Sequence, residues 1–322
     1  MKLIIQIPCY NEELNLPVTI GDLPRTIDGI DEIEYLVIDD GSTDRTAEVA
    51  KEAGVHHVVR LTKNQGYARA FAVGLEEGVR QGAAIIVTTD GDNQYNGADV
   101  ERLVKPILEG RADFVIGDRE VEKIAHFSFV KKKLQKLGSW VVRVVSNTRV
   151  PDAACGFRAF SREVALRLNV FSSYSPMLET IIQAGRNNMV VLSVPIRTNP
   201  PLRESRLIRS TFDYIFQQAL TILRTFMIYE PLKFFGCFGI GALSLGVLIW
   251  ARFLYYFFSG HGQGHVQSLI LASILLTVGF QLGLFGLLAD MIAVNRRIVE
   301  EVQYRLRKNQ QGGHGNARWM DT

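Results

Sequence analysis

The sequence predicts an α/β domain followed by two membrane-spanning helices, and three observations lead to this prediction. Short apolar, β-branched runs alternate with helical stretches up to about residue 200. Polar residues follow the ends of four of these runs. From Pro231 onward the chain becomes strongly apolar. Continuous apolar runs separated by helices are typical of parallel strands that are buried on both faces. We therefore expect a mostly parallel sheet flanked by helices.

The individual elements follow from this alternation. Strands are expected over residues 2–8, 34–40, 55–61, 83–90 and 112–118, and helices over 12–23, 42–54, 65–82 and 97–110. Ser42 or Thr43 is expected as the N-cap of the second helix, which Gly54 should end. In a parallel sheet, ligands bind at the carboxyl ends of the strands, so the functional site should lie at that edge.

Two later segments, residues 234–258 and 266–289, are long enough to cross a bilayer, which takes about 20 residues. Two core helices of a soluble domain are the alternative. Both segments are apolar on every face and their connecting loop is short, which favours the membrane. Arg252 lies in the first span and either snorkels to the headgroups or faces a phosphate.

The basic residues predict the orientation of this hairpin. The connecting loop has no Lys or Arg. Basic residues instead lie near the start of the first span and after the second span: Arg224, Lys233, Arg296, Arg297, Arg305, Arg307 and Lys308. By the positive-inside rule, both termini and the α/β domain should lie in the cytoplasm.

Four regions are thus expected. The α/β domain covers residues 1–205, and an amphipathic juxtamembrane helix region covers 206–230. The two membrane helices lie within 231–291, and a basic helix with a disordered tail covers 292–322.

The formal net charge of +3 is too small to indicate nucleic-acid binding. Cys9, Cys155 and Cys237 are few and far apart, which predicts reduced thiols.

Polar residues at the predicted strand ends indicate a nucleotide-binding cleft with acidic side chains. The first strand runs into Pro8–Glu12, the second into Asp39–Ser42, the fourth into Asp90–Asp92 and the fifth into Gly117–Arg119. The chain contains neither G-x-G-x-x-G nor G-x-x-x-x-G-K-[ST]. A Rossmann dehydrogenase and a P-loop NTPase are therefore disfavoured.

Five segments resemble, in order and spacing, family 2 glycosyltransferases with a GT-A fold: "PCYNEE", "VIDDGSTDRT", "NQGYARAFAVGL", "TDGDNQ" and "DAACGFRAFSREV". The resemblance covers residues 1 to about 210. It is strongest to polyprenyl-phosphate glycosyltransferases, which include dolichyl-phosphate mannose and glucose synthases. Bacterial members that charge a polyprenyl phosphate also carry two C-terminal spans.

The resemblance implies a divalent metal, Mg²⁺ or Mn²⁺, at Asp90, Asp92 and Gln94. Such a metal acts as a Lewis acid on a leaving diphosphate, and both ions accept an all-oxygen shell. Asp92 is the expected direct ligand, whereas Asp90 either holds the ribose or reaches the metal through water. An EF-hand loop is the alternative for this spacing, but Gly97 and the missing later Glu break that pattern.

The resemblance also assigns donor-binding residues. Pro8, Tyr10 and Glu12 are expected at the nucleoside, and Asp39 or Asp40 at the base. A carboxylate there can accept from a ring N–H or from ribose hydroxyls. Glu12 could instead be an ordinary acid in a helical first turn, and Tyr10 could be a core residue.

The acceptor expected from the resemblance is a phosphate monoester. Its second pKa of about 6 makes it mostly dianionic at neutral pH, so it needs positioning cations and no general base. The resemblance matches this role to Arg119, Lys133, Arg158, Ser205 and Arg206. The lysine run Lys131–Lys133 with Lys136 could equally be a solvated face or attract lipid headgroups.

The segment Cys155–Arg158 lacks the carboxylate that some bacterial relatives carry beside this Phe, which favours a mechanism without a base. If the acceptor were a sugar hydroxyl, Asp152 or Glu179 would be the candidate base.

The expected function is inverting transfer of one hexose-type sugar from a UDP- or GDP-sugar to a polyprenyl (undecaprenyl or dolichyl) phosphate. It should take place at the cytoplasmic face of the bilayer, with Asp92, Asp90 and Arg119 at the reaction centre. The membrane helices could form a homo-oligomer. Two alternatives stay open: transfer to a hydroxyl of a lipid-linked glycan, and an inactive GT-A scaffold subunit.

Overall fold

The computed structural model describes residues 1–120, 138–140, 142–170, 176–200, 220, 223–224, 226–260 and 266–316. Two compact units make up the chain. Unit 1 comprises Met1–Gln218 and Glu301–Thr322, and unit 2 comprises Ala219–Glu300. The first unit contains the predicted α/β domain, and the second contains the two long apolar helices.

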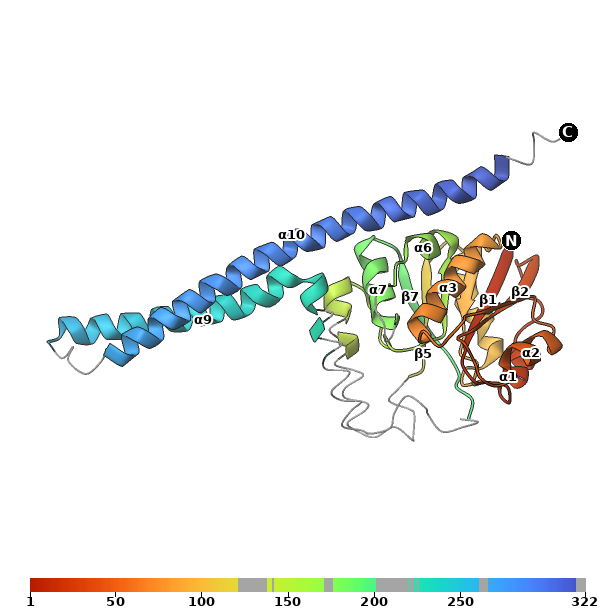
Figure 1. The fold of residues 1–322 in the computed structure, drawn as a ribbon, viewed down its shortest axis with the longest axis horizontal. Coiled ribbons are helices and arrows are strands. Elements are labelled where there is room, and N and C mark those ends of the chain that lie inside the picture. The colour runs from red at the N-terminus through yellow and green to blue at the C-terminus, as the bar shows by residue number, and fades with distance from the viewer. Residues whose placement is uncertain are drawn as a thin grey trace. The chain divides into compact units, whose positions relative to one another are not determined.

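Unit 1 is built on a sheet with strand order β3-β2-β1-β4-β6-β5-β7. Figure 1 shows this sheet with helices packed against it. The strands are β1 (Lys2–Cys9), β2 (Glu32–Asp39), β3 (His57–Arg60), β4 (Ile85–Thr88), β5 (Phe114–Asp118), β6 (Arg158–Ser161) and β7 (Val191–Pro195). The pairings between these strands are parallel except those of β6, which runs antiparallel to β4 and β5. The expected α/β fold with a mostly parallel sheet is confirmed.

Helices cover this sheet. They are α1 (Leu16–Asp22), α2 (Thr46–Glu52), α3 (Tyr67–Arg80), α4 (Val100–Leu108), which follows a short 3-10 helix (Gly97–Asp99), α6 (Arg162–Arg167) and α7 (Met177–Arg186). Helix α3 packs on β1 and β2, and α4 packs on β4, β5 and β6. The rings of Phe71 on α3, Phe160 on β6 and Phe114 on β5 form a continuous row in the core.

The start of α2 differs from the prediction. The helix begins at Thr46, and Arg45 stands at its N-cap without a side-chain capping bond. The backbone N–H of Thr46 is instead satisfied by Asp44 Oδ1 at 3.0 Å. Ser42 is engaged elsewhere, because its hydroxyl accepts from the backbone N–H of Asn11 at 2.9 Å. Ser42 and Thr43 therefore belong to the loop between β2 and α2, which is hydrogen-bonded to the loop after β1.

Strand β6 was absent from the prediction, and it matters for the site. It is short and begins with a charged residue, Arg158, which hides its strand character in the sequence. Because β6 runs opposite to its neighbours, its amino end lies at the edge where β4 and β5 have their carboxyl ends. Residues 152–157 are thereby delivered to that edge.

Unit 2 contains α9 (Pro231–Phe258) and most of α10 (Val266–Asn316), both long and apolar enough to cross a membrane. The two helices approach closely at glycines: a Cβ at Gly279 would lie 2.9 Å from the carbonyl oxygen of Gly239. Small residues allow such close backbone packing between membrane helices. Arg252 lies over the ring of Tyr256, with 5.6 Å to its centroid.

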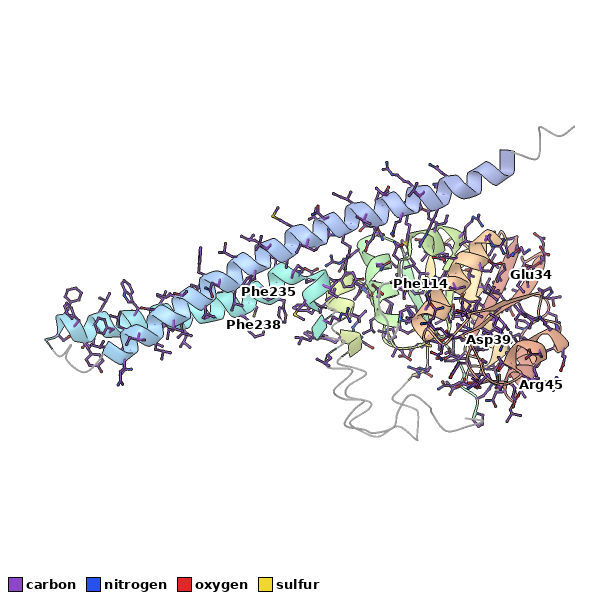
Figure 2. The ribbon with its side chains drawn as sticks, in the orientation of Figure 1. Glu34, Asp39, Arg45, Phe114, Phe235 and Phe238 are labelled. Carbon is purple, nitrogen blue, oxygen red and sulfur yellow. The ribbon has the colours of Figure 1, made fainter. Side chains whose placement is uncertain are left out.

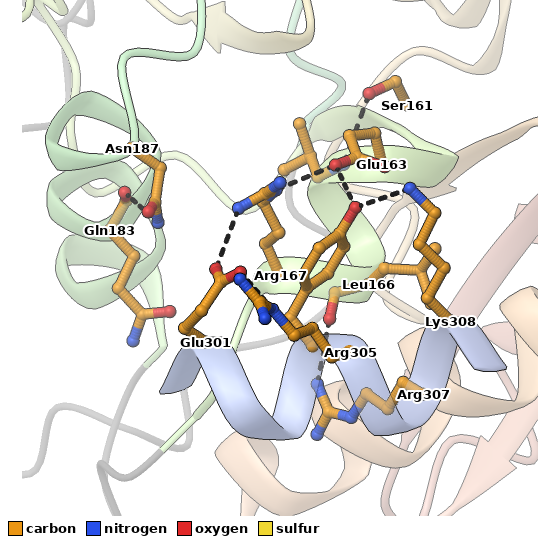
Figure 3. A network of polar contacts seen from close by, with 12 residues as sticks. Ser161, Glu163, Leu166, Arg167, Gln183, Asn187, Glu301, Arg305, Arg307 and Lys308 are labelled. Atoms are coloured by element: carbon orange, nitrogen blue, oxygen red, sulfur yellow. Dashed lines mark hydrogen bonds and ion pairs between the residues drawn. The ribbon is translucent and has the colours of Figure 1, made fainter. Parts of the chain in front are cut away.

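The end of α10 belongs to unit 1. The Tyr304 hydroxyl donates to Glu163 at 2.7 Å, and the Arg167 guanidinium lies 3.8 Å from the Tyr304 ring centroid (Figure 3). Arg307 donates to the backbone carbonyl of Leu168 at 2.9 Å. The helix continues to Asn316, so the basic helix expected within residues 292–322 extends over most of that region and leaves less of it for the expected disordered tail.

Candidate active site

The polar strand ends meet at one edge of the sheet. Strands β1, β2, β4 and β5 run in the same direction, so Cys9, Asp39, Thr88 and Asp118 all end at the same side. The loops that follow carry most of the predicted site residues that lie within the described chain, whereas Pro8, Asp39 and Arg158 lie in strands. The sheet therefore brings the predicted donor loops and Arg119 to one edge.

The loops after β1 and β2 are joined by hydrogen bonds. The Asn11 side chain accepts from the backbone N–H of Thr43 at 2.9 Å. The Glu12 backbone N–H donates to the Thr46 hydroxyl at 2.9 Å. Asn11 adopts a left-handed backbone with φ of 55°, which turns the chain sharply after the strand. These contacts hold the two loops as one rigid wall.

The predicted nucleoside residues lie in this wall. Pro8 is buried within β1, and Glu12 is 5% exposed and accepts from the Asn15 side chain at 2.8 Å. Glu12 precedes α1, so the reading of it as a helical first-turn acid is wrong. Tyr10 is 40% exposed, which excludes the core alternative for its ring.

The adjacent carboxylates Asp39 and Asp40 have different surroundings. Asp40 accepts from the backbone N–H groups of Gln65 and Gly66, each at 2.8 Å, and so fixes the loop before α3. Asp39 is fully buried and accepts from the backbone N–H of Ser42 at 2.8 Å through Oδ1. The geometry thus shows that Asp40 braces a loop. Asp39 is therefore the better candidate to bind the nucleobase of the donor.

Arg60, which the sequence did not single out, stands beside Asp39. Its Nε lies 3.2 Å from Asp39 Oδ2, an ion pair without the alignment of a hydrogen bond, and Oδ2 has no hydrogen-bond partner among the described residues. Arg60 also donates to the backbone carbonyl of Ser42 at 3.0 Å. A buried carboxylate oxygen without a donor is ready to accept one from a ligand.

Asp90 lies directly after β4 and is tightly surrounded. The Tyr67 hydroxyl, at the start of α3, donates to Asp90 Oδ1 at 3.3 Å. Gly156 comes so close that a Cβ there would lie 3.2 Å from Asp90 Oδ2. Burial, followed by the charge of Asp92, raises the pKa of Asp90 to about 7. A cation between the two carboxylates would relieve this repulsion.

Asp92 and Gln94 complete the acidic loop, which we define as residues 90–96. The Gln94 backbone N–H donates to Asp92 Oδ1 at 3.2 Å. Within the described ranges, no three His, Cys, Asp or Glu side chains gather as a ready-made metal centre. The donor set here is two carboxylates and one amide. These all-oxygen ligands fit a Mg²⁺ or Mn²⁺ ion that takes its other ligands from phosphate and water.

A segment after β7 braces the acidic loop from outside. Asn199 donates its backbone N–H to the Gln94 carbonyl at 2.9 Å and its side chain to the Asn93 carbonyl at 3.0 Å. Arg197 pairs with the buried carboxylate of Asp99 at 2.8 Å. The sequence offered no signal for this bracing, because residues about a hundred positions apart make it.

Arg119 follows β5 and is nearly buried. Its Nε and Nη2 donate to both oxygens of Asp152, at 2.7 and 3.0 Å. The two side chains are 8% and 3% exposed. Asp152 comes from the segment that antiparallel β6 delivers to this edge, which explains why its partner could not be read from the sequence.

Arg158 occupies a place unlike the one expected of a phosphate ligand. It is fully buried, and its guanidinium donates to the carbonyl oxygens of Cys155, Met177 and Ala153 at 2.6, 2.7 and 2.8 Å. Burial lowers its pKa to about 10. The acceptor role expected for Arg158 is therefore corrected: it holds the loop of residues 153–157 in place from the core side.

Three predicted acceptor residues, Lys133, Ser205 and Arg206, lie outside the described residues, as does most of the predicted juxtamembrane helix.

Cys9, Cys155 and Cys237 are all free, in agreement with the expected thiols. Burial, and next the charge of Glu12, raises the pKa of the Cys9 thiol, so it is held protonated below the acidic edge.

The sheet order with its single antiparallel strand and the acidic loop after β4 define the class: this is a GT-A glycosyltransferase domain. Comparison with known proteins gives the family. Residues 4–168 match the model of "Glycosyl transferase family 2", which is about half of the chain. The chain belongs to this family and is a glycosyltransferase.

Individual relatives agree with this assignment. The chain is 28% identical over 206 residues to polyprenol monophosphomannose synthase of Mycolicibacterium smegmatis, covering 61% of this chain and 76% of that one. It is 27% identical over 300 residues to glycosyltransferase AglJ of Haloferax volcanii, covering 88% and 91%. Because it covers 88% of this chain, the latter match reaches into the C-terminal helices.

Among solved structures, the fold is similar to glucosyl-3-phosphoglycerate synthase from Mycobacterium tuberculosis, crystallised with phosphoglyceric acid. The TM-score is 0.52 at 20% identity, over 70% of this chain and 79% of that one. At this identity the likeness concerns the fold.

Proposed function

We propose that the protein is an inverting, metal-dependent glycosyltransferase that moves one hexose-type sugar from a nucleoside-diphosphate sugar to a polyprenyl phosphate. One observation carries the proposal: the carboxylates of Asp90 and Asp92 and the Arg119 guanidinium lie at the same edge of the sheet. An anionic donor held through a cation and an anionic acceptor held by a guanidinium need this pair of neighbouring charges. Relatives named for polyprenyl-phosphate transfer support the choice of acceptor.

On the donor side, Asp39 accepts a hydrogen bond from the base, which is uracil or guanine, and the loop of Pro8, Tyr10 and Glu12 contacts the nucleoside. Asp90, Asp92 and Gln94 would hold Mg²⁺ or Mn²⁺, which when bound supplies Lewis-acid stabilisation of the leaving diphosphate. Tyr67 holds the Asp90 carboxylate through its hydroxyl. The bracing by Asn199 keeps the acidic loop from moving as charge develops.

On the acceptor side, Arg119 orients the phosphate, together with Lys133, Ser205 and Arg206. A phosphate oxygen attacks the anomeric carbon on the face opposite the diphosphate. The new bond joins this oxygen to the anomeric carbon, and the bond from that carbon to the diphosphate oxygen breaks, so the configuration inverts. The dianion needs no general base. The state of Asp152 supports this view, because both of its oxygens accept from Arg119.

The membrane helices support a lipid acceptor. A polyprenyl phosphate keeps its chain in the bilayer and presents its phosphate at the surface, where a membrane-anchored enzyme can reach it. We place unit 1 and both termini on the cytoplasmic side, from the distribution of Lys and Arg. Single cysteines placed in the loop 261–265 or near either terminus test this orientation. In intact cells, a membrane-impermeant thiol reagent should label the loop cysteine and leave the terminal cysteines unlabelled.

The direct test is to incubate membranes with a panel of radiolabelled nucleotide sugars. One UDP- or GDP-sugar should yield a product that is extracted into butanol and releases its sugar in mild acid. Label in a lipid-linked glycan that resists mild acid would favour the hydroxyl alternative. Absence of transfer and of donor hydrolysis with every sugar would favour the scaffold alternative.

A further inference from the structure

We propose that Asp152 is a positioning residue that holds Arg119 for the acceptor phosphate and keeps it away from the donor carboxylates. The inference rests on the proposed function and concerns the same site. It assigns a role to a carboxylate for which the sequence left only the role of a base.

The geometry of the pair is that of a fixed fork. Asp152 accepts from Nε and Nη2 of Arg119 at 2.7 and 3.0 Å, and both side chains are almost completely buried. Two parallel hydrogen bonds fix both the position and the plane of a guanidinium. Among the described residues, Nη1 of Arg119 makes no hydrogen bond. The pair therefore presents one defined edge of the guanidinium for a further anion.

The need for such a restraint follows from the surroundings. Arg119 is close enough to Asp90 for its charge to act on that carboxyl, which also feels Asp92 and Glu12. An unrestrained guanidinium beside this acidic loop would be attracted to it. It would then neutralise the donor carboxylates and leave the acceptor without its cation. Asp152 competes for the guanidinium and keeps the two charges apart.

The position of Asp152 is itself fixed from the core. The Ala153 backbone N–H donates to the Ser139 hydroxyl at 3.1 Å, and the Ala153 carbonyl accepts from buried Arg158 at 2.8 Å. Arg158 also binds the Cys155 carbonyl at 2.6 Å. The chain of contacts thus runs from Arg158 through the loop of residues 153–157 to Asp152 and then to Arg119.

This arrangement separates a positioning role from a general base. A base needs a carboxylate oxygen directed at the acceptor, but both oxygens of Asp152 point to Arg119. The two roles also predict different kinetics. Loss of a base lowers kcat and changes its pH profile, whereas loss of positioning raises the KM of the acceptor.

The test uses the full-length protein in detergent, with farnesyl phosphate as the acceptor and the active nucleotide sugar as the donor. Asp152→Asn should raise the KM for farnesyl phosphate about tenfold or more, the size expected from one hydrogen bond to a charged group. The KM for the donor and the hydrolysis of donor without acceptor should change less than threefold. Asp152→Glu should recover part of the loss. Glu163→Gln, which removes a remote ion-pair partner, is the matched control and should leave all constants unchanged.

A double-mutant cycle with Arg119→Ala makes the test sharper. If Asp152 acts through Arg119, Asp152→Asn should have no further effect in the Arg119→Ala background. Multiplying effects, or a fall in kcat with a changed pH profile and unchanged acceptor KM, would overturn the inference. Equal losses for donor and acceptor would show a merely structural role and overturn it as well.

Failure of the inference differs from failure of the proposed function. A wild-type protein that hydrolyses a nucleotide sugar but never glycosylates a polyprenyl phosphate contradicts the proposed function. Binding of farnesyl phosphate, measured by calorimetry on wild type and Asp152→Asn, then decides the inference, and equal affinities overturn it. If Asp152→Asn does not fold, the same comparison with Asp152→Glu decides it.

Discussion

The two units of this chain place the same kinds of side chain in opposite surroundings. In unit 1, Ile4 and Ile5 of β1 are fully buried, whereas in unit 2, Ile240 and Leu248 of α9 are each 67% exposed. Figure 2 labels Phe114 within the sheet unit and Phe238 on α9, where it is 59% exposed. Apolar surface of this extent is unfavourable in water, so unit 2 is suited to a lipid solvent.

The difference teaches how each unit is held together. Unit 1 is stabilised by removing apolar surface from water, and many of its buried polar groups are hydrogen-bonded, as the Gln6 amide nitrogen is to the Thr88 hydroxyl at 2.5 Å. Helices in lipid gain nothing from hiding apolar surface, so close packing at small residues must hold them. Four predictions sharpen this comparison or break it.

The largest effect is expected where unit 1 carries chemistry. Asp92→Ala should abolish sugar transfer while leaving both units folded, because it removes the expected direct metal ligand. Asp28→Ala, at an exposed site away from the strand ends, is the control. The assay is transfer of labelled sugar to extractable lipid, with thermal unfolding measured in parallel. A near-normal rate in Asp92→Ala would contradict the metal assignment.

Truncating a large side chain should be costly in unit 1 and cheap in unit 2. Phe114 is fully buried and stacks on Phe160 with ring centroids 4.6 Å apart. Phe114→Ala should lower the free energy of unfolding of unit 1 by about 3–5 kcal/mol. Phe238, 59% exposed, should cost at most about 0.5 kcal/mol when changed to Ala. Thermal unfolding in detergent, followed by tryptophan fluorescence, compares the two. Similar losses would mean that Phe238 is packed against protein.

In unit 2, adding a side chain at a glycine where the helices touch should be costly, although removing an exposed side chain is not. A Cβ at Gly279 would lie 2.7 Å from Leu243 Cγ, whereas nothing lies within 4 Å of one at Gly283. Gly279→Leu should therefore force the helices apart at a cost of about 1–3 kcal/mol, and Gly283→Leu should be nearly neutral. Crosslinking of cysteine pairs across α9 and α10 measures the separation. Equal crosslinking in both variants would show that the glycine contact does not hold the hairpin.

The sequence was sufficient for the elements whose signal is local. The apolar runs of β1 and β2, the glycine-flanked α3 and the two apolar helices were all visible from residue type and period. The acidic residues after β4 and Arg119 after β5 were found because their strands are parallel, so their carboxyl ends meet.

What the sequence could not give depends on contacts between distant residues. Strand β6 has only four residues and starts with Arg158. The residue type alone does not reveal that this guanidinium is buried, because most arginines are exposed to solvent. The pairing of Asp152 with Arg119 follows from the antiparallel direction of β6, and that of Asn199 with the acidic loop follows from the exit of β7. Both contacts can be predicted only when the order and direction of the strands in the sheet are known.

The smallest effect concerns the end of α10, the part of this long helix that unit 1 holds by polar contacts. Burial alone would raise the pKa of Glu163, but the hydrogen bonds from Arg167 and Tyr304 outweigh it and lower the pKa. A carboxyl with a lowered folded-state pKa contributes stability above its unfolded pKa of about 4.3, and the contribution is lost as the pH falls through the folded value. Because Glu163 is 48% exposed, solvent screening limits this to less than about 1 kcal/mol. The hydrogen-exchange protection factors of residues 301–309, which correct for the intrinsic pH dependence of exchange, should therefore fall modestly between about pH 5 and 3. Glu163→Gln should exchange faster at pH 7 and show less of this change, whereas an unaltered pH dependence would assign the docking to Arg307 and its backbone partners.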